Sequence, residues 1–228
     1  MNRTVTVTGT GEIRVKPDII RISFALSAKN THYTDMMQQA DMQMTALRQA
    51  MQHCDIEPEQ LKTADYSVRT EYEHMPDENG NYRQVFSGYV CRHELLLELP
   101  LNMTKLAEIL RAAENSLTEP EFHIAFSVRD CHAAEAQALK AAAEQARRNA
   151  EALAAAAGVR LGRLISVSNR SGTPNLVSPT NYTMMRAKMP AGACDAASAI
   201  TPEDICTEET AELVWEILDG QEAASLKD

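Results

Sequence analysis

The chain has 228 residues, 44% of them apolar, and its 22 basic and 32 acidic side chains give a formal net charge of −10. This length and apolar content suit one large or two small domains with a sizeable core. The acidic balance, without any basic cluster, argues against nucleic acid as a partner. No apolar run reaches the roughly 18 residues that a membrane span requires.

The cysteines are odd in number, scattered along the chain and never arranged as a CxxC pair. They are Cys54, Cys91, Cys131, Cys194 and Cys206. Strand patterning begins within a few residues of Met1, which leaves no room for the basic and apolar regions of a signal peptide. Both observations predict reduced thiols in a cytoplasmic protein. The alternative is a periplasmic or cell-envelope protein from which a signal peptide has been removed.

The N-terminal stretch VTVTGTGEIRVKPD, residues 5–18, alternates between apolar or glycine positions and polar positions. This period of two predicts a half-buried strand. Pro17 and Asp18 interrupt it, and the apolar positions then change parity, so a second strand follows a short turn. The inward residues of this second strand are Ile20, Ile22, Phe24, Leu26 and Ala28.

Gly9 and Gly11 in the first strand raise the question of a nucleotide-binding loop. A dinucleotide fingerprint requires a third glycine and a helix that begins inside the motif, and a Walker loop requires a following Gly-Lys-Ser/Thr. Residues 12–16 instead continue the strand. We therefore predict that the two glycines bind no phosphate. They mark either a bulge or a place where another element packs closely on the strand, and we expect that element to be an alanine-rich helix.

Apolar residues at steps of three and four predict a helix over residues 34–54. Strand patterns follow at 66–72 and 89–99, joined by a polar loop in which Asn79 and Gly80 are a hairpin signal. Cys91 and His93 fall on the apolar face of the second of these strands. They have no second ligand pair at zinc spacing, so we interpret them as packed core residues.

Asn102 and Asp130 are predicted N-caps of two further helices, at 103–117 and 131–157, on either side of a strand near 122–128. The second helix is rich in alanine and ends before Gly158, which fits the C′ position. A strand at 161–168 follows it. The residues that this helix is expected to turn toward the core are Leu139, Ala143, Ala146, Ala150, Leu153 and Ala157.

Residues 169–202 are rich in Gly, Pro, Ser, Thr and Asn, and we predict a long irregular loop there. A loop of this length is functional, mobile or an oligomer contact. Met184, Met185 and Met189 would be costly to expose as a patch, so they fit a subunit or partner contact. A last strand at 210–218 and a frayed tail at 219–228 complete the prediction.

These elements predict a single α+β domain over residues 1–228. Its sheet is mostly antiparallel and carries the three helices on its apolar face, because strands with one polar face are typical of antiparallel sheets.

Two groups of side chains are candidates for chemistry. The first is the polar cluster of Glu71, Glu73 and His74, with Asp77 and Glu78 beside it, because carboxylates and imidazole bind divalent metals. The second is Cys131, in the first turn of the long helix, where the helix dipole lowers a thiol pKa. A solvated turn and an inert thiol are the commoner outcomes, so we assign no catalytic, cofactor-binding or metal-binding residue.

Three motifs occur in an order that resembles the SIMPL-domain family. They are TVTVTGTGEIRVKPDIIRISFALSA at the start, LKTADYSVRTEY followed by GYVCRHELLLEL, and AQALKAAAEQARRNAEALAAAAGVRLGRLISVS. The closing TPEDICTEETAELVWEIL resembles the last strand of the family. The resemblance implies a mixed sheet with helices, a tendency to form oligomers, and an association with stress or signalling. It supplies no catalytic residues.

We therefore predict a non-enzymatic bacterial protein without a cofactor that forms a homo-oligomer and acts as a binding or scaffold component, with room for a further protein partner. The alternative is a thiol- or metal-dependent enzyme that uses Cys131 or the cluster of Glu71, Glu73 and His74.

Overall fold

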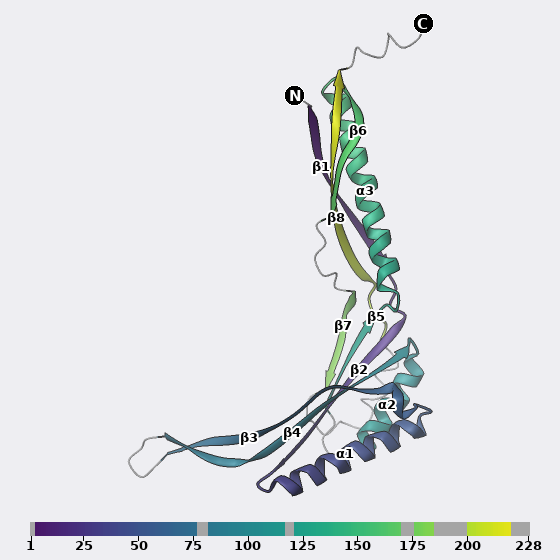
Figure 1. Cartoon of the computed structure of the whole chain (residues 1–228). Helices are drawn as coiled ribbons and strands as arrows, with labels where there is room; N and C mark the ends of the chain where they lie inside the picture. The colour runs from purple at the N-terminus through teal and green to yellow at the C-terminus, as the bar shows by residue number, and fades with distance from the viewer. Residues whose placement is uncertain (1–2, 77–81, 117–120, 170–175, 185–199, 220–228) are drawn as a thin grey trace. The chain divides into compact units, whose positions relative to one another are not determined.

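The computed structural model of the chain describes all residues except 1–2, 77–81, 117–120, 170–175, 185–199 and 220–228 (Figure 1). The chain divides into two compact units, which we call the α3 unit and the hairpin unit. The α3 unit combines Met1–Pro17, Val128–Ser178 and Glu203–Asp228. The hairpin unit combines Asp18–Ser127 and Pro179–Pro202. The prediction of a single domain stays a prediction.

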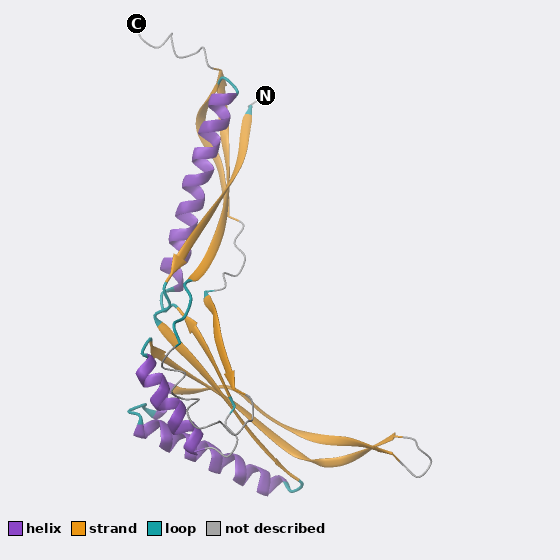
Figure 2. Ribbon diagram, turned by 180° about the vertical axis from the view of Figure 1, so that it is seen from behind, coloured by secondary structure: helices purple, strands orange, loops and turns teal. Residues whose placement is uncertain are grey.

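The α3 unit is a three-stranded antiparallel sheet with one helix along it. The strands are β1 (Thr4–Val15), β8 (Ile205–Asp219) and β6 (Val159–Asn169), in the order β1-β8-β6. Helix α3 (Cys131–Ala156) runs alongside this sheet (Figure 2). Both predicted helix ends are confirmed: the Asp130 carboxylate accepts a hydrogen bond from the backbone N–H of Ala133 at 2.8 Å, and Gly158 has φ +69°.

Helix α3 contacts its sheet through alanines at every fourth position rather than through its leucines. The buried residues of the helix are Ala134, Ala138, Ala142, Ala146, Ala150 and Ala154. This corrects the predicted face: Ala146 and Ala150 are on it, but Leu153 is 53% exposed and Leu139 only half-buried. The physical reason is the distance between helix and strand, which is too short for a leucine side chain.

Gly9 and Gly11 are what permits this short distance. A Cβ atom added at Gly9 would lie 2.8 Å from Ala146 Cα and overlap the Ala142 carbonyl, and one added at Gly11 would overlap the Ala138 carbonyl. Real Cβ atoms do not approach backbone so closely, so any side chain here forces the helix away. The prediction that these glycines contact the alanine-rich helix is confirmed.

The hairpin unit has a five-stranded sheet in the order β3-β4-β2-β5-β7. The central strand β2 pairs antiparallel with both β4 and β5, and β3 pairs antiparallel with β4. The elements are β2 (Ile19–Asn30), α1 (Tyr33–His53), β3 (Leu61–Pro76), β4 (Tyr82–Pro100), α2 (Met103–Ser116), β5 (Phe122–Ser127) and β7 (Val177–Met184).

Helices α1 and α2 cover one face of this sheet (Figure 2). The predicted inward face of β2 packs there with Leu95, Leu97 and Leu99 of β4 and the three phenylalanines Phe24, Phe122 and Phe126. Asn102 caps α2 as predicted, because its Oδ1 accepts a hydrogen bond from Lys105 N–H at 3.0 Å. The fold is therefore α+β with antiparallel strands, but the three helices are divided between two sheets and do not share one.

The predicted irregular loop at 169–202 is corrected in its described part. Strand β7 lies within it and extends the five-stranded sheet beside β5. The β-branched and aromatic residues Val177, Thr180 and Tyr182 suit a strand, and the Tyr182 ring stacks on Phe122 with centroids 6.3 Å apart. Residues 170–175 and 185–199 of that segment, and the tail from residue 220, lie outside the described part of the chain.

Candidate functional site

Strands β3 and β4 form a hairpin that continues past the end of β2 (Figure 1). The last residue of β2, Asn30, is paired with Tyr89, whereas β3 and β4 remain paired from Thr70 and Tyr89 to Pro76 and Tyr82. The outer part of this hairpin therefore consists of two strands only. An isolated two-stranded ribbon is marginally stable in water, so its side chains decide whether it persists.

A row of aromatic rings runs along one face of the outer hairpin. Tyr33 at the start of α1 contacts Tyr89 edge to face at 5.6 Å, Tyr89 contacts Phe86 at 5.2 Å, and Phe86 contacts Tyr72 at 6.0 Å. Such edge-to-face pairs contribute about 0.5–1.5 kcal/mol beyond their buried area. We call Tyr72, Phe86, Tyr89 and Tyr33 the aromatic row.

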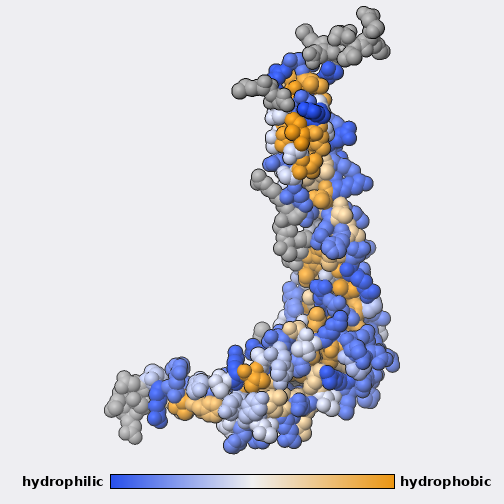
Figure 3. Space-filling model, viewed as in Figure 1, coloured by the Kyte–Doolittle hydropathy of each residue, from blue (hydrophilic) through white to orange (hydrophobic). Residues whose placement is uncertain are grey.

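The aromatic row continues the apolar face that α1 covers further inward. Val68 is paired with the buried Cys91, and in the same alternation Thr70 faces Tyr89 and Tyr72 faces Phe86. Beyond the start of α1 this face lies open: Tyr72 is 51% exposed and Phe86 is 42% exposed. Apolar side chains are visible along the hairpin in Figure 3. Contiguous apolar faces that are open in this way are frequent at interaction sites, so this face is the candidate site.

The opposite face of the hairpin is charged and is joined to the end of β2. Lys29 Nζ lies 2.8 Å from Glu71 Oε2 and 3.5 Å from Glu73 Oε1, and Ser87 Oγ donates to Glu73 at 2.5 Å. The Ser87 hydrogen bond and then Lys29 lower the pKa of Glu73, and Glu71 raises the pKa of Lys29. These contacts hold the root of the outer hairpin against β2.

A bulge at Gly88 shapes the same region. The register shifts between Glu71 and Tyr72, so that Ser87 of β4 has no partner residue on β3. Gly88 has φ +150°, and a Cβ added there would lie 2.7 Å from the Asn30 carbonyl oxygen. Only glycine fits this backbone and this approach. The bulge lies where β2 ends and the two-stranded part begins.

In the described part of the predicted polar cluster, the two glutamates form an ion-pair network. Glu71 and Glu73 face Lys29, whereas His74 contacts Gln84 at 3.4 Å and belongs to the other face of the strand. Among the residues that the structure describes, no three His, Cys, Asp or Glu side chains come together to hold a metal ion. Asp77 and Glu78 lie outside the described residues.

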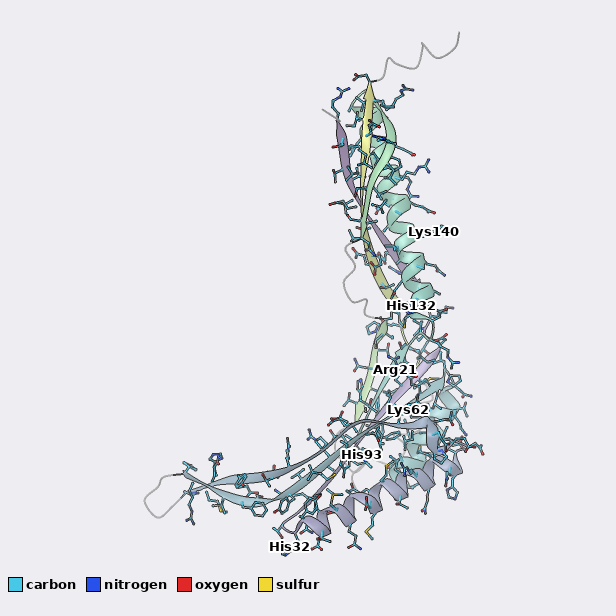
Figure 4. All side chains as sticks on the ribbon, viewed as in Figure 1. Arg21, His32, Lys62, His93, His132 and Lys140 are labelled. Atoms are coloured by element: carbon cyan, nitrogen blue, oxygen red, sulfur yellow. The ribbon has the colours of Figure 1, made fainter. Side chains whose placement is uncertain are left out.

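Cys131 is half-buried at the start of α3. Its thiol donates a hydrogen bond to the Val128 carbonyl at 3.4 Å, and its side chain packs against a cluster that includes Val128, Leu176 and Ile205. The His132 side chain contacts Glu135 and is 96% exposed to solvent (Figure 4). The structure therefore does not bring Cys131 and His132 together as a nucleophile and base.

The other cysteines occupy varied environments. Cys54 and Cys91 are buried, Cys206 is exposed, and Cys194 lies outside the described residues. The Cys206 thiol lies 3.1 Å from Glu12 Oε1, and this hydrogen bond raises the pKa of the thiol. The raised pKa lowers the thiolate fraction, and with it the reactivity of an otherwise accessible thiol.

The methionines predicted to form a contact fall largely beyond the described structure. Met184 ends β7, and Met185 and Met189 lie outside the described residues. The surface that the prediction missed is the aromatic row. A signal for it exists in the sequence: aromatic residues make up 5% of the chain, yet Tyr66, Tyr72, Tyr82, Phe86 and Tyr89 all fall within one predicted hairpin.

Comparison with known proteins adds a family and two curated relatives. A family model for SIMPL, described as a protein of unknown function (DUF541), matches residues 5–215. Proteins named 26 kDa periplasmic immunogenic protein, from Brucella melitensis biotype 1 and Brucella abortus strain S19, are each 25% identical to the chain over 173 residues. These matches cover 75% of the chain and 68% of each relative. Within its described part, the chain has no helix long and apolar enough to cross a membrane.

Proposed function

The chain belongs to the SIMPL family, whose function is unknown, and from this premise we propose that it is a non-enzymatic protein that self-associates through the outer β3–β4 hairpin. It acts as a binding or scaffold component. The observation that carries the proposal is the aromatic row, which lies on a two-stranded ribbon and is about half open to solvent. Covering these rings supplies the burial that the ribbon lacks on its own.

The residues that would serve an enzyme have structural roles here. Glu71 and Glu73 neutralise Lys29, and the Cys131 thiol packs into a small core while donating to a carbonyl. These contacts support a role in assembly over one in catalysis.

The stress or signalling setting rests on the family resemblance. The name of the two Brucella relatives calls those proteins periplasmic, and this supports the periplasmic alternative for the present chain over the cytoplasmic prediction.

The test is the mass of the whole chain in solution, measured by sedimentation over a range of concentrations. We expect the wild-type mass to exceed 25.2 kDa and to fall to the monomer value when Tyr72→Ser and Phe86→Ser are combined. The matched control is Leu153→Ser on α3, a similarly exposed apolar residue that belongs to the α3 unit, which should leave the assembly intact. A wild-type chain that remains monomeric at the highest concentration contradicts the proposal.

A further inference from the structure

Strand β3 is a long free edge of the five-stranded sheet. It is the outermost strand in the order, and its residues from Lys62 to Thr70 are all exposed. After the irregularity at Thr63 and Asp65, the strand runs without an inserted residue to Pro76. A long, regular edge presents a row of unpaired backbone groups that can pair with another chain.

In the described structure, the other outermost strands of the two sheets are each protected, and the part of β4 that extends beyond β2 begins at the bulge beside Gly88. Along β1, Gln145 of α3 accepts a hydrogen bond from Thr10 N–H at 2.5 Å, and Asn149 donates one to the Thr8 carbonyl at 3.1 Å. Strand β6 is broken by two register shifts, and β7 is short and contains Pro179. Bulges, proline and covering side chains are the usual means of blocking edge pairing. From Asp65 to Glu73, β3 itself has no proline and no inserted residue, because the bulge beside Glu71 inserts Ser87 on β4.

The sequence of β3 is complementary to itself about Thr70. Reading outward from Thr70, Arg69 on one side matches Glu71 on the other, and Val68 matches Tyr72. We propose that two copies of this chain pair antiparallel along β3, with Thr70 opposite Thr70 on the two-fold axis. The proposal rests on the proposed function, for which it names the contact surface and its register.

The charges select this register over its neighbours. Antiparallel pairing about Thr70 places Arg69 opposite Glu71 of the partner copy, twice by symmetry. Moving the axis by one residue places Arg69 opposite Arg69 or Glu71 opposite Glu71, and moving it by two places Glu71 opposite Asp65 or Glu73. Like charges directly opposite destabilise a sheet, and opposite charges stabilise it. Among the described residues Arg69 has no ion-pair or hydrogen-bond partner, whereas Glu71 already contacts Lys29 of its own chain at 2.8 Å.

The apolar face agrees with the same register. In this pairing Tyr72 lies opposite Val68 of the partner copy, and Tyr66 lies opposite His74. Aromatic and β-branched pairs are among the favourable cross-strand pairs. Tyr66, Val68 and Tyr72 are 49%, 38% and 51% exposed in the single chain, so pairing places the partner's side chains beside these half-exposed residues, including Tyr72 of the aromatic row. The second copy therefore provides charged partners on one face of β3, apolar partners on the other face, and hydrogen bonds to the open backbone groups.

A charge exchange tests the pairing in the full chain. Arg69→Glu and Glu71→Arg should each weaken self-association at least about tenfold, because each creates two like-charge contacts across the axis. Mixing the two variants should restore association as a heterodimer, since every cross-axis pair is then again of opposite sign. Arg83→Glu, the same change on β4, the other strand of the hairpin, is the matched control and should leave association along β3 unchanged. Circular dichroism verifies that each variant is folded.

A disulfide tests the register. In a background where Cys194 and Cys206 are replaced by serine, Thr70→Cys should form an intermolecular disulfide under mild oxidation, because residues opposite each other lie about 4.5–5.5 Å apart between Cα atoms. Ser67→Cys should not, since its position faces Glu73 of the partner. Mass spectrometry of the linked peptides identifies the bond.

The possible outcomes separate the two proposals. Restored association in the mixture, together with the Thr70→Cys disulfide, establishes the β3 pairing. Association that is unchanged in Arg69→Glu, without the disulfide, overturns this pairing while the proposed self-association stands. A chain that is monomeric throughout overturns both.

Discussion

At the scale of single residues, the absence of a side chain at Gly11 is important for the packing of α3 on β1. Its missing side chain lets α3 lie directly on β1, and the backbone atoms of Ala138, Ala141 and Ala142 occupy the space of a Cβ. We predict that Gly11→Ala lowers the free energy of unfolding by about 1–3 kcal/mol, because the backbone of the strand or the helix must shift. Urea denaturation followed by circular dichroism measures this change.

Gly162→Ala is the matched control for that substitution. A Cβ at Gly162 would meet side-chain atoms of Glu216 and Leu218 at 3.1–3.3 Å, and these can move. We expect a clearly smaller loss of stability there. Equal losses at Gly11 and Gly162 would show that helix approach is not the cause.

His93 makes the stability of the hairpin unit depend on pH. Burial, and then the positive charge of Arg48, lower the pKa of His93 in the folded protein below its ordinary value of about 6.5. Between the two pKa values, His93 is therefore protonated in the unfolded chain and neutral in the folded chain. As the pH falls from about 6.5 through the lower folded pKa, the stability that neutral His93 contributes is lost. Stability should rise with pH over that window.

The measurement compares the urea midpoints at pH 7.5 and pH 5.5. In His93→Gln the difference between the two midpoints should shrink, although the variant also loses the Thr63 contact and the Tyr66 ring contact at both pH values. His132→Gln, at a position exposed to solvent, should keep the wild-type difference. An unchanged difference in His93→Gln would exclude His93 as the group responsible.

At the scale of elements, periodicity predicted the existence and type of the helices and the bounds of most of them. The first two strands, the caps Asn102 and Asp130 and the stop at Gly158 were predicted because each depends on local chemistry. The inward face of α3 was predicted correctly only at Ala146 and Ala150, because the apolar pattern followed leucines such as Leu139 and Leu153, whereas this helix packs by alanines. That preference is set by Gly9 and Gly11 more than 120 residues away, which no local window contains.

The candidate surface was harder to predict than the elements that carry it. The strands of the hairpin were expected, and so was the polar cluster of Glu71, Glu73 and His74. The exposure of the aromatic row depends on how far β2 and α1 extend beside β3 and β4, which is a property of packing and not of the hairpin sequence. The same holds for Lys29, whose pairing with Glu71 and Glu73 joins segments more than 40 residues apart.

At the scale of the whole molecule, the α3 unit is built from three separate stretches of chain, yet each intervening segment leaves and returns at nearly one place. The Asp18 N–H donates to the Ser127 carbonyl at 3.0 Å, and Ser178 Oγ donates to the Glu203 carbonyl at 2.7 Å. The ends of both insertions are therefore adjacent in space, so short connections can replace them at little entropic cost.

We predict that the α3 unit folds after residues 18–127 and 179–202 are each replaced by a short Gly-Ser linker. Its alanine and glycine contact, the cluster around Val7 and Leu213, and the cluster around Val128 and Ile205 all lie within the retained segments. Circular dichroism should show helix and strand, and urea should unfold the shortened chain cooperatively. The same chain carrying Gly11→Ala should unfold at lower urea, because the helix contact is retained in it. A shortened chain without cooperative unfolding would instead support the single domain predicted over residues 1–228, since the α3 unit would then depend on residues of the hairpin unit to fold.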